Sequence, residues 1–167
     1  QQFYLELKAA FKAKSIQLVL DQDLISPIWA DRPARPSAPL FNHPLEFAGQ
    51  TASEKITGIR RVLEQKAADA LLVSTLDDVM WALNIRGGDT LYCPISESYL
   101  LITLNRCQLF VDKQKLTSDV IATLTEHGIE MEDYTQLSKT LKAFTPDSVL
   151  IHDRRNTDSL LISHIPS

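Results

Sequence analysis

The sequence of 167 residues has few cysteines, no excess of basic residues and no long apolar run. Two cysteines, Cys93 and Cys107, are too few for a disulfide framework; a pairing across a hairpin is open, but reduced thiols and a cytoplasmic location are the expectation. Because 21 acidic residues outnumber 17 basic ones, nucleic acid is excluded as the main partner. Apolar runs such as "YLLITL" fall far below the roughly 20 residues that cross a bilayer, so no membrane partner is expected.

The sequence also lacks the usual groupings of catalytic residues. It contains no P-loop, no dinucleotide fingerprint and no G-x-S-x-G elbow. Its four histidines stand apart from one another and from the cysteines, whereas a metal site needs grouped ligands. Asp77 and Asp78 are adjacent carboxylates, but acids at the start of a helix are explained by the helix dipole. We therefore predict no catalytic residue, no metal ligand and no cofactor within this segment.

The chain does have enough apolar residues, 44% of the total, to bury a core, and their spacing alternates between helical and strand periods. We expect helices over 2–14, 51–66, 75–84, 118–127, 136–144 and 157–165, and strands over 16–20, 70–74, 98–104, 108–112, 129–133 and 148–152. The helix at 75–84 would be capped by Ser74 or Thr75, and the final helix would begin at Thr157. Helices alternate with strands from residue 51 onward, so the fold class is α/β, a sandwich with a mixed sheet flanked by helices.

Two local signals organise the first third of the chain. Five prolines between Pro27 and Pro44 remove hydrogen-bond donors and fix φ, which predicts an extended connector between structural units. After the connector, Thr51 and Glu54 have the spacing of a capping box, the clearest helix start in the sequence.

The stretch "DDVMWALNIRGGD", residues 77–89, combines acids, a tryptophan and an arginine. Trp81 and Leu83 are two residues apart and cannot point into one face of a helix, so we expect this short helix to be covered on more than one side. Trp81 would then be buried, and Trp81→Ala would destabilise the domain markedly.

Several segments, taken in order, resemble one family. They are "IWADRPARPSAPLF", "FAGQTASEKITGIR", "LDDVMWALNIRGGDTLYCPISESYLLI" and "LFVDKQKL". This series is similar to the three-domain Xaa-Pro aminopeptidases of the creatinase and prolidase superfamily. The resemblance implies that residues 1–46 are the C-terminal part of a first N-terminal-type domain plus the connector. Residues 47–167 would be a second α/β domain of the creatinase N-terminal type.

The same resemblance implies a function for a longer parent protein. Members of the family remove the first residue of peptides whose second residue is proline, using two divalent metals, usually manganese, in a C-terminal domain absent here. The segment would be noncatalytic, would pack beside the parent's own catalytic domain and would shape access of peptide substrates. A homodimer of the parent is also implied, because family members are often dimers. The alternative is a protein-interaction module of the same fold without peptidase activity.

Arg86 and Asp89 are the candidate residues for contact with substrate. A charged pair on a glycine-containing loop could line the entrance of a neighbouring active site and pair with peptide termini. Alternatively, Arg86 caps the carbonyls that end the preceding helix, or pairs with Asp77, Asp78 or Asp89. Asp78 and Asp89 also have the 11-residue separation of the family's two metal aspartates, but they belong to a different motif.

Overall fold

A central sheet of five strands organises the computed structural model, which describes residues 2–19 and 22–166. The strand order is β6-β5-β4-β2-β7. The strands are β2 (Ala70–Val73), β4 (Ser98–Thr103), β5 (Cys107–Val111), β6 (Glu130–Asp133) and β7 (Leu150–His152). The two outer pairs, β5 with β6 and β2 with β7, are parallel, whereas the two inner pairs are antiparallel. The predicted mixed sheet is therefore confirmed.

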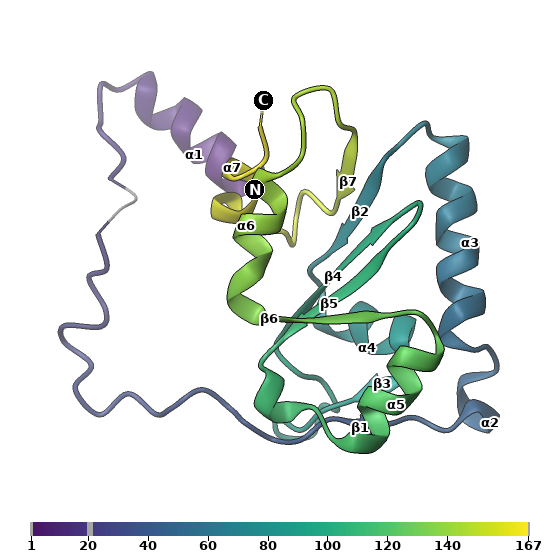
Figure 1. The fold of residues 1–167 in the computed structure, drawn as a ribbon. Helices are drawn as coiled ribbons and strands as arrows, with labels where there is room; N and C mark the ends of the chain where they lie inside the picture. Colours follow the sequence, from purple (N-terminus) through teal and green to yellow (C-terminus); the bar gives the residue numbers. More distant parts are fainter. Residues whose placement is uncertain (1, 20–21, 167) are drawn as a thin grey trace.

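Helices cover both faces of this sheet (Figure 1). One face packs against α3 (Ala52–Gln65), α4 (Leu76–Leu83) and α5 (Ser118–Glu126), and the other against α6 (Leu137–Lys142) and α7 (Ser159–Ser163). Strand β4 shows the alternation, since Leu100 and Ile102 join the first core and Leu101 joins the second. Strands buried on both faces read as continuous apolar runs, which explains "YLLITL".

A second, smaller sheet lies at the lower end of the domain in Figure 1, which also carries the short helix α2 (Leu45–Ala48). Strands β1 (Phe41–Asn42) and β3 (Ile85–Arg86) pair antiparallel there. This ribbon ties the end of the connector to the segment that leaves α4, because the His43 amide also donates to the Asn84 carbonyl.

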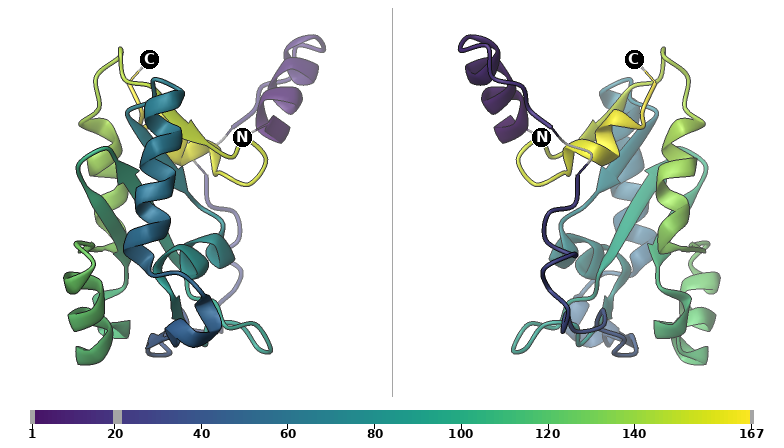
Figure 2. Two further views of the ribbon diagram at one scale, coloured as in Figure 1. Left: turned by 90° about the vertical axis from the view of Figure 1, so that its right-hand side faces the viewer. Right: turned by 90° about the vertical axis from the view of Figure 1, so that its left-hand side faces the viewer.

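The N-terminal part lies outside the core. Helix α1 (Gln2–Lys12) has no buried residue and stands off the domain in both views of Figure 2. Residues 32–40 form neither helix nor strand, and Leu40 is the first buried residue in the described part of the chain. The predicted strand at 16–20 is wrong over residues 16–19, which have no regular structure, and Leu20 lies outside the described residues. Without a neighbouring strand, an apolar run of this length has no ladder to join.

The local start and stop signals are confirmed for α3 and for the end of α4, whereas Thr75, at the N-cap of α4, makes no side-chain capping bond and Ser74 contacts Thr157 instead. At the capping box of α3, the Thr51 hydroxyl accepts from the Glu54 amide while Glu54 accepts from Thr51. Helix α4 ends at Asn84, which has the left-handed φ of 52°. The cap of α7 is Asp158 rather than Thr157; the Asp158 carboxylate accepts from the Leu160 amide, while Thr157 is buried within hydrogen-bond distance of Ser74.

The predicted burial of Trp81 is wrong. Its side chain is 52% exposed, whereas Val79, Met80 and Leu83 are buried. The indole lies on the outer face of α4, where it lines a cavity of about 220 Å³ between α3, α4 and β2. The Lys55 ammonium packs over the indole ring at 4.4 Å from its centre. One side of this helix is therefore covered by a buried lysine rather than by a second layer of protein.

Candidate functional site

The loop that follows β3, residues 87–97, connects the small sheet to β4. It begins with residues 87–89, the last three of the stretch "DDVMWALNIRGGD". Arg86 stands at its start. The Nη1 of Arg86 donates to the carbonyls of Met80, at 3.0 Å, and of Ile85, at 2.8 Å. Since Met80 lies in the last turn of α4, the expected capping of helix carbonyls is present. No ion pair joins Arg86 to Asp77, Asp78 or Asp89.

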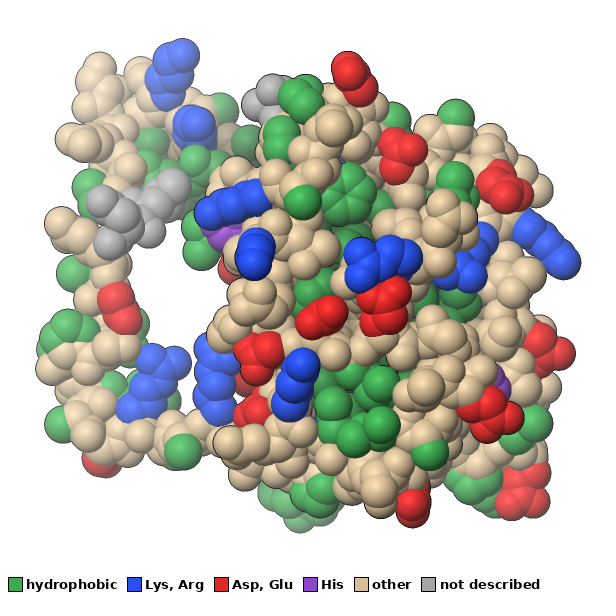
Figure 3. Space-filling view, in the orientation of Figure 1, with side chains coloured by type: hydrophobic (Ala, Val, Ile, Leu, Met, Phe, Trp, Pro, Cys, Tyr) green, Lys and Arg blue, Asp and Glu red, His purple; other side chains and the backbone are tan. Residues whose placement is uncertain are grey.

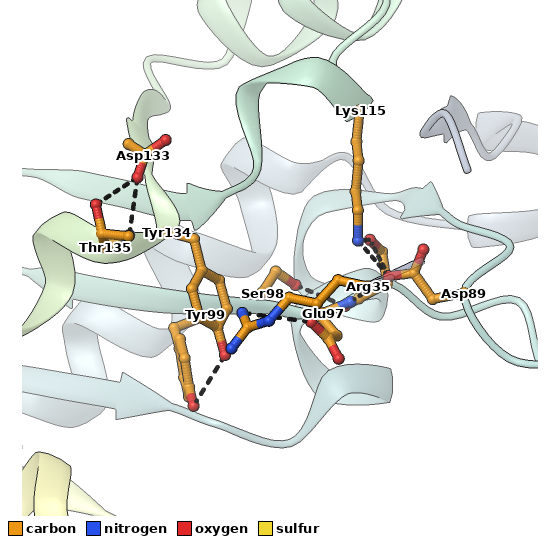
Figure 4. Close-up of polar contacts among 10 residues, drawn as sticks. Arg35, Asp89, Glu97, Ser98, Tyr99, Lys115, Asp133, Tyr134 and Thr135 are labelled. Atoms are coloured by element: carbon orange, nitrogen blue, oxygen red, sulfur yellow. Dashed lines mark hydrogen bonds and ion pairs between the residues drawn. The ribbon is translucent and has the colours of Figure 1, made fainter. Parts of the chain in front are cut away.

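Asp89 forms a buried ion pair with Lys115, which lies 26 residues further along the chain (Figure 4). The Lys115 Nζ lies 2.5 Å from Asp89 Oδ2, and the two side chains are 2% and 3% exposed. The same oxygen accepts from the Ser96 hydroxyl, at 2.9 Å, and from the Glu97 amide, at 2.7 Å. Burial opposes ionisation of Asp89, but these donors outweigh it and hold the pKa of its carboxyl below the usual range.

Close backbone packing closes the loop on itself. The Asp89 amide donates to the Ile95 carbonyl at 3.1 Å, and the Gly87 amide donates to the Pro94 carbonyl at 3.3 Å. A Cβ placed on Gly87 would lie 2.6 Å from Ser96 Cβ and 2.9 Å from the Ile95 oxygen. Gly87 is therefore required for close approach rather than for flexibility, and the loop is a packed element.

A second polar group joins the connector to the same region (Figure 4). The Arg35 guanidinium lies 5.3 Å from the centre of the Tyr134 ring and 3.8 Å from Glu97. Tyr134 in turn donates its hydroxyl proton to Tyr99 at 3.4 Å, and burial raises the pKa of Tyr99. Arg35 is thus one of the contacts between the connector and the domain; another is the Leu40 amide, which donates to the Lys115 carbonyl at 2.8 Å.

The two aspartates with the 11-residue separation form no common site. Asp78 is exposed in the first turn of α4, and Asp89 is bound to Lys115. A carboxylate oxygen that already accepts from an ammonium, a hydroxyl and an amide is a poor metal ligand. Among residues 2–19 and 22–166, no group of three or more His, Cys, Asp or Glu side chains could hold a metal ion.

Sequence reasoning missed the residues that hold this loop. Lys115 follows a strand in "VDKQKL", where a surface position is the ordinary expectation for lysine, yet it is buried. Lys55 was missed likewise; its Nζ donates to Asn84 Oδ1 and to the Trp81 carbonyl, at 2.6 and 2.8 Å. No local pattern marks either lysine, because their partners lie 26 to 29 residues away.

The fold is an α/β sandwich domain. At its lower end, the 87–97 loop is held by the buried Asp89–Lys115 ion pair and by the close packing of Gly87. Residues 31–167 match the family model described as the Creatinase/Prolidase N-terminal domain. The chain belongs to this family, as the motifs indicated. In the described residues, no helix has the length and apolar character needed to span a membrane.

The similar proteins are named as aminopeptidases. The chain is 35% identical to Aminopeptidase P1 of Lotus japonicus over 141 residues, covering 84% of this chain and 21% of that protein. It is 42% identical over 119 residues to a probable Xaa-Pro aminopeptidase P of Sordaria macrospora, covering 71% of this chain and 19% of that protein. The chain thus spans about a fifth of the length of the curated relatives it matches.

A solved structure agrees with this assignment. X-prolyl aminopeptidase from Caenorhabditis elegans, described as a cytosolic enzyme with a di-nuclear active site, matches 80% of this chain with a TM-score of 0.77 and 32% identity. Again the match covers only 22% of that protein.

Proposed function

We propose that this chain is a noncatalytic segment of a metal-dependent Xaa-Pro aminopeptidase. The observation that carries the proposal is the unequal coverage: most of this chain matches about a fifth of proteins named as aminopeptidases. A segment of that kind contributes to the enzyme by packing beside the catalytic domain and shaping access to it. The names of the relatives favour this proposal over a separate interaction module.

The parent would remove the first residue from peptides with proline at the second position. Two divalent metals, manganese by the family resemblance, would be held by the catalytic domain outside this chain. A cytoplasmic location and a homodimer of the parent belong to the same proposal, supported for location by the cytosolic relative. The division into a connector-containing unit, 1–46, and an α/β domain, 47–167, is likewise proposed; it is supported by the finding that none of the described residues before Leu40 is buried.

The test compares the full-length parent with the segment. Both are assayed with manganese and an Xaa-Pro peptide, and circular dichroism establishes that the segment is folded. We expect turnover by the parent only. Metal-dependent turnover by the pure segment would contradict a noncatalytic role, and an inactive metal-loaded parent would contradict the assignment to this peptidase.

We further propose that Arg86 and Asp89 serve the rim of the substrate entrance in the parent, Arg86 by direct contact and Asp89, whose side chain is 3% exposed, only indirectly. Of the guanidinium nitrogens of Arg86, only Nη1 donates a hydrogen bond to another described residue. The remaining N–H groups of the guanidinium are left as donors for a peptide carboxylate. Asp89 would act by holding the loop in place. For Arg86→Ala in the parent, a several-fold rise in KM with a small change in Tm is expected; a lowered Tm with unchanged KM would refute the substrate role.

A further inference from the structure

The tip of the 87–97 loop is an apolar projection that nothing in the described chain covers. Leu91 is 79% exposed and Tyr92 is 97% exposed. Both lie in a tight turn closed by the Cys93 amide, which donates to the Thr90 carbonyl at 3.2 Å. Figure 2 shows this teal loop projecting from the lower end of the domain. Large apolar side chains in such a position contribute nothing to the core of this domain.

The backbone at the tip is strained. Tyr92 has a φ of 63°, in the left-handed region that costs free energy for a residue with a Cβ. Such strain persists only where the surroundings impose it. Here the base of the loop does so, through the buried Asp89–Lys115 pair and the close contact of Gly87 with Ser96. The base of the loop therefore supports the strained backbone that carries the two exposed side chains.

The chemistry of the tip points to a protein surface. Residues 90–96, "TLYCPIS", carry no charged side chain. Three further exposed apolar side chains lie on elements of the same lower end: Phe41, Leu45 and Phe47. In Figure 3, hydrophobic side chains stand at the lower edge in separate groups, with acidic side chains between them. Grouped exposed apolar residues mark interaction sites, and tyrosine is enriched at protein interfaces.

We propose that the tip, residues 90–93, docks on the parent's own catalytic domain. The inference rests on the proposed function and names the surface that makes the contact. The relatives are about five times longer than this chain, so most of a parent protein lies outside the structure. A domain joined covalently to this one is present at an effective concentration of about millimolar, which favours it over a second copy or a separate protein.

The two cysteines provide the test. Cys93 is exposed beside Tyr92, whereas Cys107 is buried in β5, where burial raises the pKa of its thiol to about 12. Iodoacetamide is added to the full-length parent, to the 167-residue chain and to a synthetic peptide of residues 90–95. Mass spectrometry follows the two thiols separately. Low reactivity of Cys107 reports that each protein is folded.

We expect Cys93 to react in the chain at nearly the rate of the peptide, and at least tenfold more slowly in the parent. Leu91→Ser combined with Tyr92→Ser should restore its reactivity in the parent, while Val62→Ser, at another exposed apolar position, should not. Equal rates for Cys93 in peptide and parent would overturn the proposal. Protection that vanishes on dilution of the parent would assign the surface to a second copy and overturn it too.

Alkylation does not depend on turnover, so the two proposals fail separately. An active parent with a reactive Cys93 would leave the peptidase function standing and remove the docking site. An inactive parent with a protected Cys93 would refute the proposed peptidase function. The docking of the tip on the parent's own C-terminal domain would still stand.

Discussion

Replacing Lys115 by methionine is expected to destabilise the domain by about 3–5 kcal/mol, the usual cost of leaving one member of a buried ion pair without its partner. Methionine keeps the length of the side chain but leaves the Asp89 carboxylate 3% exposed. Asp89 Oδ2 would retain only the Ser96 and Glu97 donors, and Asp89 Oδ1 already has no partner in the described structure. Against a total stability of about 5–15 kcal/mol, this loss is large.

The assay is urea unfolding of the 167-residue chain, with the free energy of unfolding taken at zero denaturant. Asp89→Asn is measured alone and together with Lys115→Met. The double variant should lose less than the sum of the two single losses, by about 1 kcal/mol or more, because it no longer buries a lone charge.

The Arg106–Glu130 pair is the matched control, since its side chains are 56% and 42% exposed. Glu130→Gln should cost about 1 kcal/mol or less, because exposed pairs contribute little. A loss below about 1 kcal/mol for Lys115→Met, or strictly additive losses in the double variant, would refute the reasoning that the buried pair holds the loop.

Three further predictions concern the same region. Gly87→Ala should lower Tm by several degrees, because its Cβ would lie 2.6 Å from Ser96 Cβ, whereas Gly58→Ala in α3 meets nothing within 4 Å and should raise stability by about 0.5–1 kcal/mol. Trp81→Ala should cost about 1 kcal/mol in urea unfolding, well below the 3–5 kcal/mol of a buried tryptophan, because the indole is 52% exposed. Since the pKa of Asp89 is lowered in the folded state, its stabilisation is present above pH ~4 and lost as the pH falls through the lowered pKa.

Each of these predictions has a contradicting result. Equal effects of the two glycine substitutions would show that the contact with Ser96 is easily relieved. A loss above about 3 kcal/mol in the free energy of unfolding for Trp81→Ala would show that the indole is buried, as the sequence predicted. For the pH dependence, Asp89→Asn should flatten the fall in stability below pH ~4; an unchanged slope would show that other carboxylates cause it.

Signals contained within a few residues were sufficient to predict much of the fold. Thr51 and Glu54 are three residues apart, and the hydrogen bonds that they exchange form as soon as the helix does. The β4–β5 hairpin needs only a short turn between two apolar runs, and Gly128 follows the end of α5 with a positive φ of 70°. The strand at 16–20 failed because an apolar run alone does not supply a pairing partner.

The sequence by itself determined the family and the alternation of helices with strands around a mixed sheet, because these depend on residue order and local hydrogen bonding. Only the tertiary structure decided that Trp81 faces outward, that Lys115 reaches Asp89 and that Leu91 and Tyr92 project from a rigid loop. These contacts join residues far apart in the chain. Their energies depend on which groups lose water together, and no local spacing encodes that.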